Sequence, residues 1–388
     1  MKGDFSVRSL RIESSLESSL AAPLVIFLAA LASSLYPFAQ KAIAQEPPKY
    51  QVDPAWPKEL PNNWIMGQVG GMAVDSHDHI WVLQRPSTDT PEELGAAQTP
   101  PRSMCCMTTP PVLVFDAQGN LLQSWGGPGE GFDWPKIEHG IYVDKDDNVW
   151  IGGNGPTDRQ VLKFKSDGKF VMQIGHSSAD PPDSSRTDIL GRPAGIDIDP
   201  DAHEIYIADG YMNKRVIVFD SETGAFKRLW GAYGNKPNDA DPGQYNPSAP
   251  PDQQFRNPVH CVHISRDGLV YVCDRVNDRM QVFTKQGKFV KEFSVRTQTL
   301  GMGSVWQFAF SKDDKQKFLL IDDGENNVIW TVQRDDGKVV GQMGHRGRNA
   351  GQFHWVHQIV SDSQGNLYTG EVDTGKRIQK FVLVRQKK

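Results

Sequence analysis

Residues 257–275 read NPVHCVHISRDGLVYVCDR, with two apolar runs on either side of an Asp-Gly pair. This order predicts a β-hairpin whose turn lies at the Asp-Gly pair. His260 stands at the start of the first run and Asp274 at the end of the second. The same pattern recurs at 139–153 (HGIYVDKDDNVWIGG) and at 357–371 (HQIVSDSQGNLYTGE), so three predicted hairpins begin with a histidine.

Hairpins of this kind repeat along the chain, each followed by a third strand, a turn and a last strand. The six first strands begin near Gly70, His139, Ala194, His260, Trp306 and His357. Four-stranded units of this size hide their edges and faces by packing radially around an axis. The units resemble NHL repeats. We therefore predict an all-β, six-bladed propeller over residues 45–388, its ring closed by an N-terminal strand within 49–56 that completes the last blade.

Propeller geometry assigns a face to each loop. If the first strand of each blade lines the channel, its first residue lies at one mouth, and the second strand returns to that mouth. Three long insertions should open on this face, at 86–110, 176–193 and 231–257. Long loops on a rigid scaffold usually carry function, so we expect the functional site at this mouth.

Composition limits the partners and the compartment. The formal charge is −5 and no basic stripe is present, which argues against a nucleic acid partner. Residues 20–39 are apolar, and Ala-Ile-Ala at 42–44 fits a signal-peptidase site. We interpret 1–44 as a secretory signal or an uncleaved membrane anchor, which would be the only contact with a membrane. The propeller should then be secreted or periplasmic, or anchored facing outside the cytoplasm, and we expect a monomer.

The four cysteines form two sequence pairs. Cys261 and Cys273 are equidistant from the hairpin turn and should face each other, either as a disulfide or as two buried thiols. Cys105 and Cys106 lie in the first insertion, which should overhang the site. They could form a stiffening vicinal disulfide or remain thiols that gate the site, and an exported protein favours the disulfide.

Three histidines form the candidate metal site. His139, His260 and His357 take the same repeat position in blades two, four and six, so they should converge on the axis. Three neutral imidazoles suit zinc and leave a coordination position open, as in catalytic sites. His263 should face the other side of its strand. The remaining histidines show no repeat relation and are expected at the surface: His77, His79, His176, His203, His345 and His354.

Arg85, Tyr211 and Arg275 follow second strands and should reach the same mouth. With these residues the chain resembles the propeller of the peptidyl-α-hydroxyglycine α-amidating lyases. The resemblance implies a zinc held by the three histidines and cleavage of the N–C bond of an α-hydroxyglycine, giving an amide and glyoxylate. It also implies that Tyr211 takes the hydroxyl proton and that the two arginines hold the carboxylate of a small-molecule or peptide C-terminal substrate.

One departure and several alternatives remain open. The family has an Asp after the third histidine that supports a bound calcium, whereas this chain has Gln358, so calcium would lose a charged ligand. We assign zinc and leave calcium as an alternative. Arg275 could instead pair with Asp274 or Asp278, and Tyr211 could be a packing residue. The alternative function is a non-catalytic NHL platform that binds a protein. A lactonase-like hydrolase would need carboxylate and amide ligands for calcium, against which three imidazoles argue.

Overall fold

The computed structural model describes residues 46–385, a single compact unit. The predicted signal or anchor at 1–44 therefore lies outside the described residues. Within the described range, no helix is both long and apolar enough to cross a membrane.

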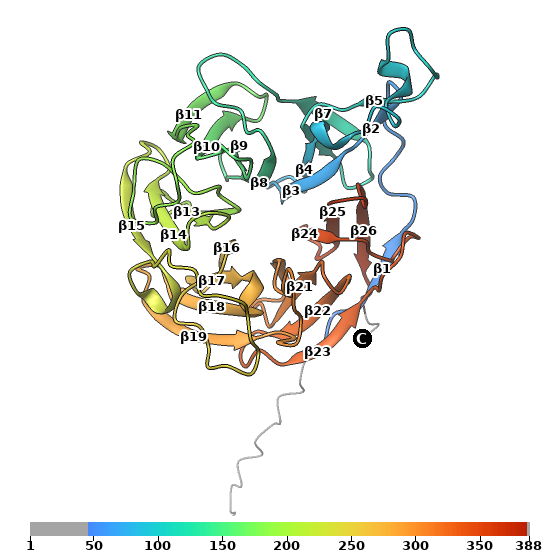
Figure 1. The fold of residues 1–388 in the computed structure, drawn as a ribbon. Coiled ribbons are helices and arrows are strands. Elements are labelled where there is room, and N and C mark those ends of the chain that lie inside the picture. Colours follow the sequence, from blue (N-terminus) through green and yellow to red (C-terminus); the bar gives the residue numbers. More distant parts are fainter. Residues whose placement is uncertain (1–45, 386–388) are drawn as a thin grey trace, which may run out of the picture. The chain divides into compact units, whose positions relative to one another are not determined.

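Six four-stranded antiparallel sheets form a ring around a central axis, as predicted (Figure 1). Blade one contains β3 (Gln68–Val74), β4 (Ile80–Arg85), β6 (Val112–Phe115) and β7 (Leu121–Trp125). Blade two contains β8 (Glu138–Val143), β9 (Asn148–Gly153), β10 (Gln160–Lys165) and β11 (Phe170–Gly175). Blade three contains β12 (Gly195–Asp199), β13 (Glu204–Asp209), β14 (Arg215–Asp220) and β15 (Phe226–Trp230).

The other half of the ring follows the same order. Blade four contains β16 (Val259–Ile264), β17 (Leu269–Asp274), β18 (Arg279–Thr284) and β19 (Phe289–Ser294). Blade five contains β20 (Gln307–Phe310), β21 (Phe318–Asp323), β22 (Val328–Gln333) and β23 (Val339–Met343). Blade six contains β24 (Val356–Ser361), β25 (Leu367–Glu371), β26 (Ile378–Leu383) and β1 (Tyr50–Asp53).

The ring is closed by the N-terminal strand. β1 pairs antiparallel with β26, with Tyr50 opposite Leu383, which confirms the prediction. Trp56, just after β1, is buried and packs edge-on against Tyr368 of blade six, with the ring centroids 5.0 Å apart. The last blade therefore gains its outer strand from the start of the propeller, which leaves β26 without a free edge.

A repeated aspartate turn joins the first two strands of several blades on the face away from the histidines. In blade two, Asp144 accepts hydrogen bonds from the backbone and Nδ2 of Asn148 and from Nε1 of Trp150. In blade six, Asp362 and Asn366 repeat the arrangement. Because these carboxylates bind turn amides and a buried aromatic together, they hold the hairpins in register.

Cys261 and Cys273 are directly opposed on β16 and β17 and form a disulfide, which settles the choice between a bridge and two thiols. Both belong to the apolar cluster packed between blades four and five. Apolar clusters of this kind, between neighbouring blades, make up the core.

The first insertion differs from its prediction. Cys105 and Cys106 do form a disulfide. However, β5 (Met107–Thr108) pairs with β2 (Trp64–Ile65), and Asn63 donates from Nδ2 to the carbonyl of Met104. Figure 1 shows this region at the outer rim of the ring, so the expectation that it overhangs the site is wrong. The physical reason is that a short strand pairing ties the insertion to the segment before β3, away from the axis.

Candidate metal and catalytic site

Each of the three histidines occupies a β-bulge at the start of a channel-lining strand. On β16, Val259 pairs with Asp274 and Cys261 with Cys273, which leaves His260 as the extra residue. On β24 and β8, the register shifts in the same way at His357 and at His139. A bulge redirects the side chain of the extra residue, and here the effect is to aim three imidazoles at the axis.

The three imidazoles lie together and are fully buried. Their exposed fractions are 0%, 1% and 2% for His139, His260 and His357. The ring centroids are 4.8 to 5.2 Å apart, and Nε2 of His139 lies 3.1 Å from Nε2 of His357. Alternate blades therefore do bring their histidines to one point.

Neighbouring blades set the tautomers of two of these rings. Nδ1 of His139 donates to the carbonyl of Ala194 at 2.9 Å, and Nδ1 of His260 donates to the carbonyl of Trp306 at 2.5 Å. A carbonyl only accepts hydrogen bonds, so the proton is on Nδ1 and the lone pair on Nε2. Second-sphere partners of this kind are typical of histidines that bind metals.

His357 has a different partner. Its Nδ1 lies 3.2 Å from Nε2 of Gln358, which also donates to the carbonyl of Gly70 at 3.2 Å. The amide thus links blade six to blade one directly behind the third imidazole. A half-turn of the same amide would present its oxygen to Nδ1 and give His357 the tautomer of the other two rings.

The protonation state and spacing of the three rings fit a zinc ion. Burial lowers the pKa of each imidazole well below its usual value, and the guanidiniums of Arg85 and Arg275 lower it further. For His139 and His357, the neighbouring rings add to this effect on the pKa. The rings are therefore neutral near pH 7, as metal ligands must be. Two nitrogens bound at zinc–nitrogen distances to one tetrahedral ion lie about 3.3 Å apart, close to the observed Nε2 separation. The donor set thus fits the group that the sequence predicts.

Tyr211 completes the cluster. Its hydroxyl oxygen lies 3.0 Å from Nε2 of His139 and 3.1 Å from Nε2 of His260. The preceding Gly210 packs so closely on β16 that a Cβ there would lie 2.0 Å from the carbonyl oxygen of Val259. Glycine at this position lets the turn after β13 approach the axis. Tyr211 therefore contacts two of the three imidazoles.

Arg275 lies beside the same cluster and is 2% exposed. Its guanidinium lies 4.5 Å from the ring centroid of Trp306 and 5.8 Å from that of Tyr211. Burial lowers its pKa, and Nε is buried without a hydrogen-bond partner among the described residues. A buried guanidinium with an unused donor is suited to a ligand carboxylate.

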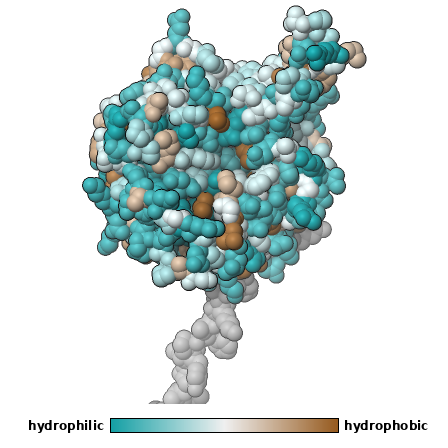
Figure 2. Space-filling view, viewed as in Figure 1, coloured by the Kyte–Doolittle hydropathy of each residue, from teal (hydrophilic) through white to brown (hydrophobic). Residues whose placement is uncertain are grey.

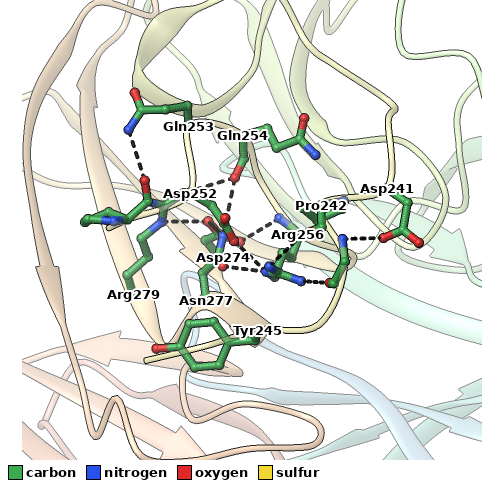
Figure 3. Close-up of polar contacts among 12 residues, drawn as sticks. Asp241, Pro242, Tyr245, Asp252, Gln253, Gln254, Arg256, Asp274, Asn277 and Arg279 are labelled. Atoms are coloured by element: carbon green, nitrogen blue, oxygen red, sulfur yellow. Dashed lines mark hydrogen bonds and ion pairs between the residues drawn. The ribbon is translucent and has the colours of Figure 1, made fainter. Parts of the chain in front are cut away.

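The alternative pairing of Arg275 with Asp274 is wrong. Asp274 instead accepts from Nε of Arg279 at 2.7 Å and from Nδ2 of Asn277 at 2.8 Å. Figure 3 shows that Arg256, at the end of the third insertion, joins this network through Asn277 and Asp252. Asp274 therefore holds the third insertion against blade four. The guanidinium of Arg275 is not paired with it and can serve the site.

Arg85 approaches from blade one. Its Nε donates to the carbonyl of Glu138 and its Nη1 to Oε1 of Gln68, both at 2.8 Å. Blade one has Gly70 at its bulge, and a Cβ there would lie 2.2 Å from the carbonyl oxygen of Glu138 and 3.2 Å from Nε of Arg85, which donates to that oxygen. Glycine at the position where three other blades have histidine thus leaves room for the hydrogen bond between Arg85 and Glu138. Burial lowers the pKa of Arg85, as it does for Arg275.

A second group of possible ligands, Asp75, His77 and His79, lies on the opposite face of blade one. Nδ1 of His79 lies 3.0 Å from Oδ2 of Asp75, which also accepts from Nε1 of Trp81. His79 therefore takes the place that an asparagine has in the aspartate turns of blades two and six. The repeat explains this group without a metal. His263 is also outside the site, on the channel wall, where Nε2 lies 2.6 Å from Oε1 of Gln307.

Sequence reasoning missed the role of Trp306. Its ring lies 6.2 Å from that of His260 and 5.9 Å from that of His357, and its carbonyl accepts from His260. The available signal was its place at the start of the fifth first strand, where blades two, four and six have histidine. Nothing in its residue type indicated a contact with Arg275.

No protein-family model matches this chain. Over 342 residues it is 24% identical to the peptidyl-glycine alpha-amidating monooxygenase of Mus musculus, covering 85% of this chain and 32% of that protein. It is 25% identical over 356 residues to the peptidyl-alpha-hydroxyglycine alpha-amidating lyase 1 of Drosophila melanogaster, covering 86% and 60%. It is 29% identical over 254 residues to NHL repeat-containing protein 3 of Mus musculus, covering 62% and 58%. The chain thus spans less than two thirds of each relative.

Among solved structures, a streptogramin B lyase aligns with a TM-score of 0.50 and 13% identity, covering 87% of this chain and 98% of that chain. At this identity the likeness supports the propeller fold alone.

Proposed function

We propose that this NHL propeller, which resembles the α-amidating lyases, is a zinc-dependent carbon–nitrogen lyase. Its substrate would be an α-hydroxyglycine at the end of a peptide or small acyl chain, and its products an amide and glyoxylate. The two disulfides in the described residues favour a secreted or periplasmic protein.

One observation carries the proposal. Three neutral imidazoles direct their Nε2 atoms at one point, and a phenol oxygen lies within 3.1 Å of two of them. Structural zinc sites are closed by four protein ligands, whereas this one offers three imidazoles and a hydroxyl that can exchange a proton. The buried guanidiniums of Arg85 and Arg275 add the positive charge that a carboxylate substrate needs.

The residues divide the chemistry between them. His139, His260 and His357 would hold the zinc, which when bound supplies Lewis-acid polarisation of the substrate. Arg85 and Arg275 would bind the carboxylate and orient the hydroxyl toward Tyr211. The deprotonated phenol oxygen would take the hydroxyl proton while the C–N bond breaks, its electron pair going to nitrogen. The nitrogen then gains a proton, so the amide and glyoxylate balance the substrate. Calcium has no place in this proposal.

The second candidate is a non-catalytic platform that binds a protein through the loop-bearing face. It is kept because a relative that is 29% identical, NHL repeat-containing protein 3, has a name that states no enzymatic activity. A platform does not require three buried imidazoles that lie together or two buried arginines without carboxylate partners, so the lyase accounts for more of the site.

The deciding experiment measures glyoxylate release from an N-acyl-α-hydroxyglycine against its spontaneous decay. The lyase predicts acceleration by the wild type. Tyr211→Phe should lower kcat by at least about 100-fold and keep its metal, because it removes a proton acceptor and no ligand. His139→Ala should lose both rate and metal, and His203→Ala, at an exposed site, should lose neither. A fully metallated wild type without acceleration would support the platform instead.

A further inference from the structure

A wide groove of about 1110 Å³ lies between blades four and five. It is formed by the loop after β19, the turn after β21 and the segment after β23. The second and fourth strands of a blade end on the same face, and β17, which ends just before Arg275, is also a second strand. The groove therefore opens on the face that carries the candidate site.

Two arginines line this groove without a carboxylate or hydrogen-bond partner among the described residues. Arg296 and Arg346 have no ion pair and no side-chain hydrogen bond to any residue in the described range. Elsewhere, Arg228 and Arg377 bind carboxylates. Arg296 lies 4.0 Å above the ring of Trp330, from a backbone with φ of 56°. A positive φ at a residue other than glycine costs free energy. An arginine that lies over an aromatic ring can still donate its N–H groups to an anion.

The groove is connected to the site through two tryptophans. Asn327, in the groove wall, accepts from the backbone N–H of Trp355 at 2.6 Å. The ring of Trp355 lies 5.9 Å from that of Trp306, which contacts Arg275 and lies beside His357. A chain whose end occupied the site could therefore continue past these rings into the groove.

The lining indicates what such a chain would be. The carboxamides of Gln298 and Gln342 can bind peptide N–H and C=O groups, and the two arginines can bind carboxylates. Glu325 is also present, but one of its oxygens accepts from the backbone of Met302. We propose, building on the proposed lyase function, that this groove binds the peptide chain leading to the hydroxyglycine end and prefers acidic side chains in it.

Binding of unreactive peptides tests the groove separately from catalysis. Fluorescein-labelled glycine-extended hexapeptides, one with two glutamates and one with two lysines before the glycine, would be titrated with the intact protein and followed by anisotropy. The acidic peptide should bind about five- to tenfold more tightly at low salt. The double variant Arg296→Gln, Arg346→Gln should remove this preference. Arg348→Gln is the matched control, because Arg348 binds Thr374 and lies outside the groove.

Equal affinity for the two peptides, or an acidic preference that survives the double variant, would overturn the groove proposal. If the double variant fails to fold, Arg346→Gln alone is the substitute, because the backbone of Arg346 is not in the positive-φ region and the single variant should fold. It should remove part of the acidic preference. The peptides lack the hydroxyl and cannot be split. If the protein does not cleave hydroxyglycines but still prefers the acidic peptide, the proposed lyase function is rejected and the groove proposal stands.

Discussion

At the scale of single residues, the site depends on which nitrogen of each imidazole carries the proton. His139 and His260 are set by carbonyls of the next blade, whereas His357 is set by the side chain of Gln358. A carbonyl fixed in the backbone cannot turn, but an amide can present either its oxygen or its nitrogen. The third ligand is therefore the one whose tautomer a single substitution can alter.

Gln358→Leu should weaken zinc binding about 10- to 100-fold, since it removes the partner of Nδ1 on His357 and keeps all three ligands. Zinc affinity would be measured by competition with a chromophoric chelator. Gln358→Glu should restore most of the affinity, because a carboxylate accepts from Nδ1. Unchanged affinity in the leucine variant would show that the amide does not position His357.

Asp278 makes stability depend on pH. It is buried beside Asp323 and Asp274, and burial raises its pKa from an ordinary 3.8 to about 7. Between pH 4 and 7 the folded chain therefore holds a proton that the unfolded chain has lost, so this residue makes stability fall as pH rises. Asp278→Asn should match the wild type near pH 4 and unfold on the order of 5 °C higher at pH 8. A pH-independent difference between the two melting curves would contradict this assignment.

At the scale of elements, the bulge in the first strand of blade four positions a side chain, whereas the disulfide in the same hairpin links two strands. The bulge directs His260 to the axis, and the disulfide one residue later ties β16 to β17. The bridge closes a chain segment with a sequence separation of 12, whereas the Cys105–Cys106 bridge joins neighbours. Only the first can restrict the unfolded chain appreciably.

Reducing Cys261–Cys273 should therefore cost about 3 kcal/mol of unfolding free energy, and reducing Cys105–Cys106 almost nothing. Urea unfolding with and without dithiothreitol would measure both, using Cys105→Ala, Cys106→Ala to isolate the first bridge. A large loss that disappears in that double variant would instead assign the stabilisation to the vicinal bridge.

At the scale of the whole molecule, the ring is held by contacts between blades that are far apart in sequence. β1 and β26 close it, and Trp56 packs on Tyr368 across the closure. The face seen in Figure 2 is mostly hydrophilic. Trp56 and Tyr368 belong to a buried apolar cluster at the closure. Metal binding at the axis would connect blades two, four and six in addition.

Deleting residues 46–56 should lower the melting temperature by on the order of 10 °C and promote association, because β26 becomes an open edge. Differential scanning calorimetry and size-exclusion chromatography would follow the two effects. Gln51→Ala, at an exposed position of β1, is the control and should change neither. A deletion variant as stable and as monodisperse as the control would show that ring closure contributes little.

Much of this arrangement is local and could be read from the amino-acid order. Alternating apolar runs, Asp-Gly turns and a repeat of constant spacing are properties of neighbouring residues, and they predicted six blades, ring closure and the shared position of His139, His260 and His357. Tyr211 and Arg275 were found in the same way, since each follows a second strand that must return to one face.

Other features arise only when distant segments meet. The carbonyls of Ala194 and Trp306 bind histidines of the preceding blade, and the amide of Gln358 binds the carbonyl of Gly70 in blade one, so each contact joins segments that are distant in the sequence. The position of the first insertion at the outer rim likewise follows from the pairing of β2 with β5, two short strands that the periodicity of the sequence does not predict. The sequence repeat determines which residues occupy the same place in each blade, because every blade is formed from the same order of strands and turns. Packing between blades determines the hydrogen-bond partners of those residues, because any buried polar group must be satisfied by whatever the next blade presents.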